Sequence, residues 1–290
     1  VETIDDFKTK VMLPMLINVL KASARHFTCD GLERLDPDKR YLFVSNHRDI
    51  LLDAGLLNFI FARHKMPATE IAIGDNLIKG DLYRELSRCN RMFPIFRGGS
   101  RREFFQSSLL TSQYIRYVLK EKDRSVWIAQ RNGRTKDGDD RTEPGLIKMF
   151  SMSGSKDFVE NMSELNIVPV SVSYEFEPCA DRKVHETHVK MEEGHYEKTA
   201  TEDLESIIQG LHDQKRDIHF SICPPITREE LAQCAEAEPT DAHISRSNAA
   251  YTALSALIDR RIHEGYKLFP FSLEAYELLK AQSKERDLGS

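Results

Sequence analysis

Short apolar runs alternate along this chain with stretches in which apolar residues recur at helical spacing. Runs rich in β-branched and aromatic residues, bounded by polar or turn-forming residues, are typical of strands. They occur at residues 41–45, 71–73, 92–96, 125–129, 167–174 and 219–222, with helical patterns at 49–63, 81–88 and 102–120. Because short strands separated by helices form β-α-β units, this order predicts an α/β fold: a mainly parallel central sheet flanked by helices.

The two ends of the chain depart from this alternation. We expect an N-terminal helical segment over residues 1–27, an α/β core over residues 28–226 and a C-terminal helical extension, or cap, over residues 227–290. Within the extension, helical patterns lie at residues 229–235, 242–266 and 272–280. The pattern contains no internal repeat and no low-complexity tract.

The N-terminal segment carries the longest apolar run, Val11 to Leu20, which Pro14 and Asn18 interrupt. It is shorter than the roughly 20 apolar residues that span a bilayer. Basic residues flank it: Lys8, Lys10, Lys21 and Arg25. This pattern fits an interfacial helix that lies on a membrane, and it fits equally a helix packed on the protein's own core. Peripheral membrane contact through residues 7–27 is therefore one of two open interpretations.

Composition narrows the functional classes. The chain is 40% hydrophobic and 30% charged, as in ordinary globular proteins, and its net charge of −5 argues against a nucleic-acid partner. Its five cysteines are widely scattered, without a close pair. That distribution favours reduced thiols in a cytoplasmic setting over a disulfide framework or a zinc site.

The first candidate constellation follows the strand at residues 41–45. His47 lies at the carboxyl end of this strand, where open α/β sheets place their ligands. A neutral imidazole can take a proton from a hydroxyl group if a second group holds its other ring nitrogen. Asp49 and Asp53 are four residues apart on one helix face, and either could supply that carboxylate. Asp49 could instead be the N-cap of the helix.

The second constellation follows the strand at residues 92–96. Arg97, the glycine pair Gly98 and Gly99, and Arg101 precede the helix expected from residue 102. Glycines let a backbone approach a ligand, a helix N-terminus presents free N–H groups to an anion, and arginine binds phosphate in a bidentate manner. The sequence thus predicts an anion site here, against the alternative of a solvated turn with surface arginines.

A third strand, at residues 125–129, leads to a polar loop that contains Asn132, Gly133 and Arg134. This loop is a candidate for substrate binding, and a plain polar turn is equally compatible with it. In the strand at residues 167–174, Pro169 predicts a sheet edge, a bulge or a strand start, because proline cannot donate to a sheet ladder.

In this order, the four constellations resemble the motifs of the glycerolipid acyltransferase family, which contains glycerol-3-phosphate and 1-acylglycerol-3-phosphate acyltransferases. Asn46-His47 matches the first motif, and Arg97 resembles the arginine of the second. Residues 132–135 stand where the family has Glu-Gly-Thr-Arg, and Val168-Pro169-Val170 matches the fourth motif. The resemblance covers roughly residues 28–180, and its specificity rests on four motifs in the right order.

The chain departs from the family pattern at three places. Five residues, not four, separate His47 from Asp53. Pro94 stands where the second motif has phenylalanine. Asn132 stands where the third motif has glutamate, and the order of Arg134 and Thr135 is exchanged.

The resemblance implies a function for each motif. His47 would be the general base on the acceptor hydroxyl, and Asp53 would fix its tautomer. Acyl-CoA or an acyl carrier protein would donate the acyl group as co-substrate, with neither a metal nor another cofactor. The implied anion-binding residues for a lipid precursor acceptor are Arg97, Arg101, Gly133 and Arg134, and Asn132 would contact an acceptor hydroxyl or a loop arginine. The implied setting is the cytoplasm, at the inner face of a membrane.

The residues also allow a comparison with other functional classes. His47-Arg48-Asp49 matches part of a kinase catalytic loop, but the glycine-rich loop and the Asp-Phe-Gly motif are missing. His185 and His188 lack the i, i+4 spacing of a zincin site and lie in a strand-like stretch, which argues against a metal. A lipid hydrolase that uses the same His-Asp pair, and a non-catalytic lipid-binding protein of the same fold, both stay open.

Overall fold

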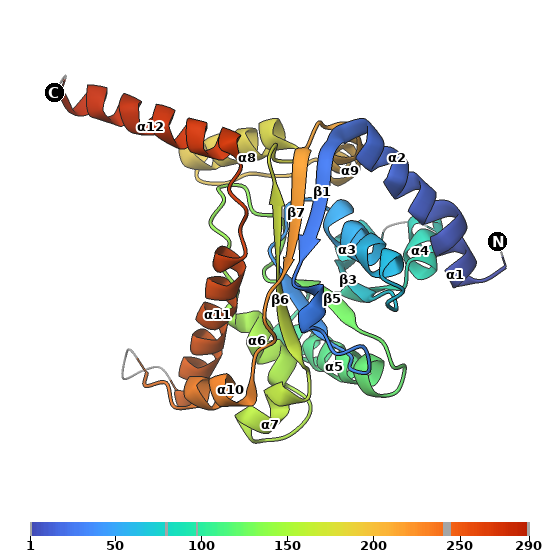
Figure 1. Cartoon of the computed structure of the whole chain (residues 1–290). Helices are drawn as coiled ribbons and strands as arrows, with labels where there is room; N and C mark the ends of the chain where they lie inside the picture. The colour runs from blue at the N-terminus through green and yellow to red at the C-terminus, as the bar shows by residue number, and fades with distance from the viewer. Residues whose placement is uncertain (1, 79–80, 97, 240–244, 289–290) are drawn as a thin grey trace.

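A single sheet lies at the centre of the part of the chain that the computed structural model describes, residues 2–78, 81–96, 98–239 and 245–288. Within these residues the sheet has seven strands, in the order β1-β7-β6-β2-β5-β3-β4 (Figure 1). The strands are β1 Ala24–Asp30, β2 Leu42–Ser45, β3 Glu70–Gly74, β4 Met92–Ile95, β5 Val126–Ala129, β6 Ile167–Tyr174 and β7 Arg216–Ile222. All neighbouring strands are parallel except β6 and β7, so the predicted mainly parallel sheet is confirmed.

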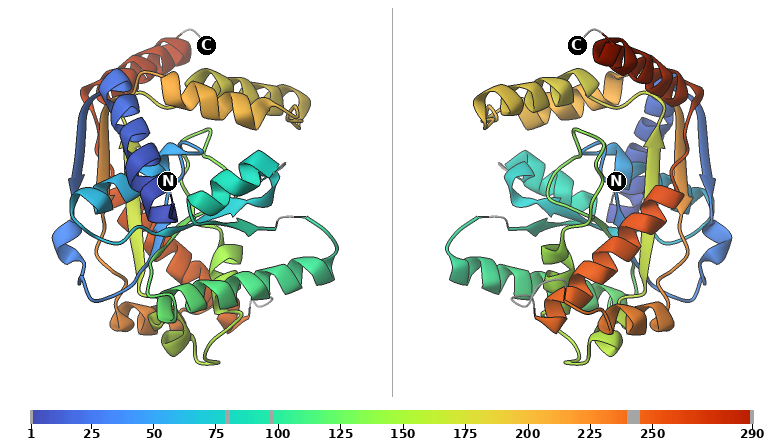
Figure 2. Two further views of the ribbon diagram at one scale, coloured as in Figure 1. Left: turned by 90° about the vertical axis from the view of Figure 1, so that its right-hand side faces the viewer. Right: turned by 90° about the vertical axis from the view of Figure 1, so that its left-hand side faces the viewer.

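Helices cover both faces of the sheet. The described helices are α1 Ile4–Phe7, α2 Leu13–Ser23, α3 Leu52–Arg63, α4 Asp81–Cys89, α5 Arg101–Lys120, α6 Pro144–Ser151, α7 Phe158–Ser163, α8 Ala180–Glu193, α9 Glu202–His212, α10 Arg228–Ala235, α11 Arg246–Glu264 and α12 Pro270–Leu288. Residues of α2 and α3 pack with one sheet face into one apolar core, whereas residues of α5, α6 and α11 form a second core on the other face. Figure 2 shows these layers from two sides.

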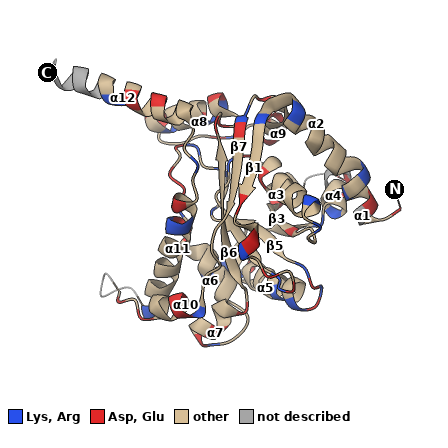
Figure 3. Cartoon of the chain, viewed as in Figure 1, with Lys and Arg blue, Asp and Glu red and all other residues tan. Residues whose placement is uncertain are grey.

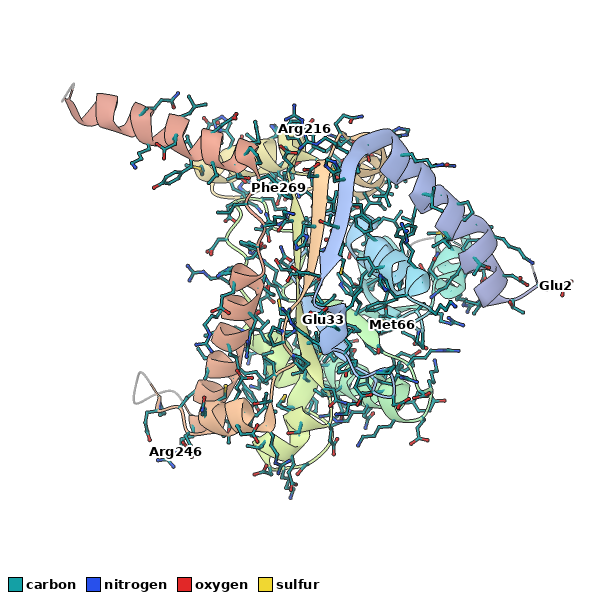
Figure 4. All side chains as sticks on the ribbon, in the orientation of Figure 1. Glu2, Glu33, Met66, Arg216, Arg246 and Phe269 are labelled. Carbon is teal, nitrogen blue, oxygen red and sulfur yellow. The ribbon has the colours of Figure 1, made fainter. Side chains whose placement is uncertain are left out.

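Side chains from the sheet and from both helical layers fill the space between them (Figure 4). The strands at the centre of the sheet are nearly uncharged, whereas the upper ends of β1 and β7 carry charged residues (Figure 3). There Arg25 reaches Asp217 at 2.9 Å and Glu175 at 3.2 Å, which joins β1, β7 and the end of β6. Apolar strands covered on two faces, with charge at their ends, are what a buried parallel sheet requires.

Helix α2 packs on the protein's core through one side of its apolar run, and membrane contact through residues 7–27 stays a prediction. Leu16 is only 4% exposed and lies near Gly55 of α3. The apolar neighbours Leu13, Ile17 and Leu20 are partly buried against the same core. In the described residues, no helix is both long enough and apolar enough to cross a bilayer.

Three local predictions differ from the structure. Residues 24–27, expected within the N-terminal helical segment, begin β1 instead, because they pair with β7. His185 and His188 lie in helix α8, not in a strand-like stretch. Pro169 lies inside a strand with neighbours on both sides. It is tolerated there because it faces Cys223, one residue beyond the end of β7, so the N–H that proline lacks is missing only where that ladder ends. Its carbonyl still accepts from Cys223 N.

Candidate active site

The loop between β2 and α3 brings His47 and Asp53 together. β2 ends at Ser45, and the loop that follows returns the chain so that α3 begins at Leu52. His47 Nδ1 lies 2.8 Å from Asp53 Oδ2. Asp53 is fully buried, while the His47 side chain keeps 14% exposure. The pair therefore combines a buried carboxylate with an imidazole that solvent can still reach.

The carboxylate of Asp53 is held by hydrogen bonds within the fold. Oδ2 accepts from the backbone N–H groups of Arg48 (2.6 Å) and Asp49 (3.0 Å), and Oδ1 accepts from the Tyr174 hydroxyl (2.9 Å). Burial alone would raise the pKa of Asp53, but the bonds from His47 and the two backbone groups outweigh it and lower this pKa. Asp53 is therefore ionised at neutral pH.

An ionised carboxylate can only accept a hydrogen bond, so His47 Nδ1 carries the proton in this contact. The neutral imidazole then has an unprotonated Nε2, which is the form a general base needs. Tyr174, on β6, completes the arrangement. Burial and the nearby Asp53 charge raise the pKa of Tyr174, so that it stays protonated as a donor. Sequence reasoning missed Tyr174, because no local spacing connects it with His47.

Asp49 has a different role in the same loop. Its Oδ1 accepts from Leu51 N (2.9 Å) and Leu52 N (2.8 Å). Asp49 thus caps the first turn of α3 from two residues before the observed N-cap position, Leu51. Its Oδ2 is buried against Gly210 of α9 and has no hydrogen-bond partner among the described residues. Burial and the charge of Asp53 raise the pKa of Asp49. The structure thus places Asp53, and not Asp49, against His47.

Asn46 fixes the loop to the neighbouring strand. Its Nδ2 donates to Val172 O (3.0 Å), and its Oδ1 accepts from Val172 N (2.8 Å), so the side chain continues the pairing of β2 with β6. On the other side, the His47 ring meets the Trp127 ring edge-on, with centroids 5.7 Å apart. The Trp127 indole donates to Ser45 Oγ at 3.0 Å. These contacts leave His47 few orientations.

Asp140 connects this loop with the third motif and the C-terminal extension. It is fully buried, and its Oδ2 accepts from Arg48 Nη2 (2.5 Å), from Asn46 Nδ2 (3.2 Å) and from the Tyr266 hydroxyl. His263 Nε2 of α11 lies 3.0 Å from the Asp140 carbonyl oxygen. Its Oδ1 accepts from the Thr135 hydroxyl of the third motif. Sequence reasoning missed Asp140, because its other partners are remote in the chain.

The third-motif residues separate in space. Asn132 lies at an apolar cavity, and its N–H donates to Glu143 Oε1 at 3.2 Å. Gly133 has φ of +76°, a conformation that glycine adopts without strain. Arg134 is buried, and its charge acts on Asp49 and Asp203 on the α9 side. Its Nη1 has no hydrogen-bond partner in the described part of the chain.

The cavity has a volume of about 560 Å³ and lies between α5, α6 and the carboxyl ends of β3, β4 and β5. Its lining is mostly apolar, with charged or amide groups from Arg101, Arg131, Asn132, Glu143 and Lys148. Ala129, in its wall, pairs with Ser45, two residues before His47. Arg101 and Asn132, two of the residues predicted to bind substrate, therefore line one cavity, whereas Arg134 does not line it. Arg97 lies outside the described residues.

Comparison with known proteins identifies the class of enzyme. The model of the Acyltransferase family matches residues 26–173, just over half of the chain. The chain therefore belongs to the acyltransferase family, and the resemblance found in its motifs is confirmed.

Among solved structures, the fold is similar to the crystal structure of the 1-acyl-sn-glycerophosphate (LPA) acyltransferase PlsC from Thermotoga maritima. The TM-score is 0.46 and the sequence identity 11%, over 91% of this chain and 83% of that chain. The comparison with curated proteins finds no match.

Proposed function

We propose that this acyltransferase moves a fatty acyl group from a thioester of CoA or acyl carrier protein to a hydroxyl of a glycerol phosphate, a lysophospholipid or a related polar lipid. The observation that carries this proposal is the 2.8 Å contact between His47 Nδ1 and Asp53 Oδ2. It assigns the proton to Nδ1 and leaves Nε2 free to act as a base.

In the proposed step, His47 Nε2 takes the proton of the acceptor hydroxyl while the hydroxyl oxygen attacks the thioester carbonyl carbon. The carbon–sulfur bond then breaks, and the thiolate leaves with the proton that His47 returns. Asp53 stabilises the imidazolium between these events, as the carboxylate does in a catalytic triad. The reaction needs no covalent intermediate on the enzyme.

The binding roles follow from the cavity. Its apolar wall suits an acyl chain, and Arg101 with Asn132 in its lining supports binding of the acceptor's anionic group. Gly133, next to Asn132 in the chain, stays a predicted contributor to that binding. Arg97 stays a predicted member of this site. Arg134 is proposed instead to stabilise the loop after β5 from its buried side, since its charge acts on Asp49 and Asp203. We place the reaction in the cytoplasm, at the inner face of a membrane.

The experiment that tests the proposal is mass spectrometry of products from a panel of acceptors, incubated with palmitoyl-CoA or palmitoyl carrier protein. Acylated acceptor that depends on His47 is the expected result. Free palmitate without acylated acceptor would identify a hydrolase that uses the same His-Asp pair. Acceptor binding without turnover on any donor would identify a non-catalytic lipid-binding protein.

A further inference from the structure

Large apolar side chains gather on the surface where β4 leads into α5. Phe104 and Phe105, in the first turns of α5, are 53% and 59% exposed, and Phe96 and Leu110 are similarly open. Together with Arg101 and Arg102 they form what is named here the α5 ledge. Isolated exposed apolar residues are ordinary, but a group of exposed aromatic residues marks an interaction surface.

The ledge is continuous. Phe96, Phe104 and Phe105 line the mouth of the 560 Å³ cavity, and Phe96 and Leu110 line a neighbouring hollow of about 590 Å³. Figure 2 (left) shows that the N-terminal end of α5 extends beyond the edge of the sheet. The apolar cavity and the exposed aromatic rings therefore share one opening.

The charge of the ledge is positive. Arg101 and Arg102 are exposed at the start of α5. The acidic residue beside them, Glu103, forms the capping box: its carboxylate accepts from Ser100 N at 2.7 Å, while its own N–H donates to Ser100 Oγ at 3.3 Å. An aromatic surface with arginines at its rim complements an anionic lipid bilayer, whose surface attracts each nearby basic residue by about 1 kcal/mol.

Two other apolar surfaces fit a bilayer less well. On α2, Leu16 is buried and Leu13, Ile17 and Leu20 are partly buried against the core, so less of its apolar side is exposed. Helix α12, which projects from the body in Figure 1, exposes five large apolar side chains, Phe271, Leu273, Tyr276, Leu278 and Leu279. Among these residues lie two carboxylates, Glu274 and Glu277, and Lys280 follows Leu279. Carboxylates repel an anionic surface, so the α5 ledge is the surface whose charge matches.

We propose that the α5 ledge docks on an anionic membrane surface, with Phe104 and Phe105 inserted at the interface and Arg101 and Arg102 among the lipid headgroups. The inference rests on the proposed function and deepens it, because docking there opens the apolar cavity toward the bilayer that holds the lipid substrates. It places the membrane contact at α5, whereas the sequence had offered residues 7–27 for it as one of two interpretations.

The test is co-sedimentation of the full chain with phosphatidylcholine vesicles, with and without phosphatidylglycerol, at low and high salt. Wild type is expected to bind the anionic vesicles at low salt and to release them at high salt. Phe104→Ser with Phe105→Ser should weaken binding by about tenfold or more, because two interfacial rings are lost. Arg102→Gln should weaken it by about fivefold.

The matched control removes Val184 and Met191, which are 66% and 82% exposed on α8, by substitution with serine. This control should bind like wild type, and thermal melting checks that each variant is folded. The Arg102→Gln variant keeps the test decisive if the double serine variant does not fold. Three results would overturn the proposal: no binding of wild type at low salt, equal losses in ledge and control variants, or a loss caused instead by Val11→Ser in the N-terminal segment. Vesicle binding is measured without substrate, so it can fail while acyl transfer to soluble acceptors succeeds.

Discussion

Two neighbouring parts of the active-site edge are built in opposite ways. In the loop of His47, the Asp53 carboxylate receives all its hydrogen bonds from the fold, and its neighbours Asn46 and Trp127 are buried. The cavity at Arg101 and Asn132 is instead apolar and open at its mouth. The difference indicates that the group that moves protons is oriented before substrate arrives, whereas the binding end adapts to its ligand. Preorganisation of that kind lowers the cost of reaching the reacting geometry.

The two aspartates of the loop also differ in electrostatics. The pKa of Asp53 is lowered, so its ionised form favours folding: this stability is present above the ordinary carboxyl pKa and is lost as pH falls through the folded pKa. The pKa of Asp49 is raised, so its contribution is present at low pH and is lost as pH rises through the folded pKa. In this loop, ionisation of Asp53 therefore stabilises the folded protein, whereas ionisation of Asp49 destabilises it.

The largest effect on the rate is expected when the preorganised loop loses its proposed base, His47. His47→Ala should lower acyl transfer by about 10²-fold or more, the scale of general-base catalysis. Folding should survive, because Asp53 keeps Tyr174 and two backbone donors. Steady-state rates and thermal melting measure both quantities. Near-normal turnover in this variant would end the proposed mechanism.

Removing the charge of Asp53 should have a smaller effect on rate, because the imidazole remains. Asp53→Asn is expected to reduce turnover by about tenfold to 10²-fold. It should also lower the melting temperature, since an amide cannot accept all the hydrogen bonds that the buried carboxylate accepts, and each orphaned donor costs about 1–3 kcal/mol.

Tyr174→Phe provides the matched control for Asp53→Asn, because it deletes one donor to the same carboxylate and keeps the ring. Rates per folded enzyme compare the two variants. Full activity of Asp53→Asn, with a loss in Asp49→Asn instead, would assign the orienting role to Asp49.

The apolar cavity, the more open of the two parts, is tested by substitution of Asn132. Asn132→Glu should raise kcat/KM for the acceptor by about tenfold, because a charged hydrogen bond contributes roughly 1.5–3 kcal/mol. Glu143 already places a carboxylate oxygen 3.2 Å from Asn132 N, so the variant is best measured with and without Glu143→Gln. A gain confined to the Glu143→Gln background would identify Glu143 as the carboxylate of this cavity. Equal or lower activity in both backgrounds would contradict the prediction.

The smallest effect concerns the cap. Asp49→Asn keeps an oxygen for Leu51 N and Leu52 N and removes the buried charge, whereas Asp49→Ala removes both. The alanine variant should therefore be about 1 kcal/mol less stable than the asparagine variant, the usual value of a lost cap. Above the ordinary carboxyl pKa, stability of Asp49→Asn should depend less on pH than that of wild type. Denaturant unfolding at several pH values measures this, and equal stability of the two variants would remove the capping role.

The elements that carry a strong local pattern were predictable from the sequence, and those held by distant contacts were not. The runs at residues 41–45 and 167–174 form β2 and β6, because apolar β-branched residues bury on both sheet faces. β1 was missed, since its polar residues become a strand only through pairing with β7.

The same division holds in the site. The position of His47 after a strand predicted its place at the sheet edge. Spacing left Asp49 and Asp53 both open, and the family resemblance favoured Asp53. Tyr174 bonds Asp53 across 121 residues of sequence, and Asp140 bonds Arg48 across 92. Contacts at such separations leave no periodic trace, because each depends on two strands or loops that meet only in the folded sheet.

Pairing of β1 with β7 has a consequence for synthesis on the ribosome. Arg25 and Asp217 lie 192 residues apart in sequence, so the N-terminal strand has no partner until nearly the whole core has emerged. At 5–20 residues per second that interval is roughly 10–40 s. Over its last part, roughly 2–8 s between the end of β6 at Tyr174 and the start of β7 at Arg216, β6 has an open edge where β7 will pair. Unpaired edges of this kind invite association with other chains. A nascent chain stalled before residue 216 is therefore the species in which chaperone binding to this protein should be greatest.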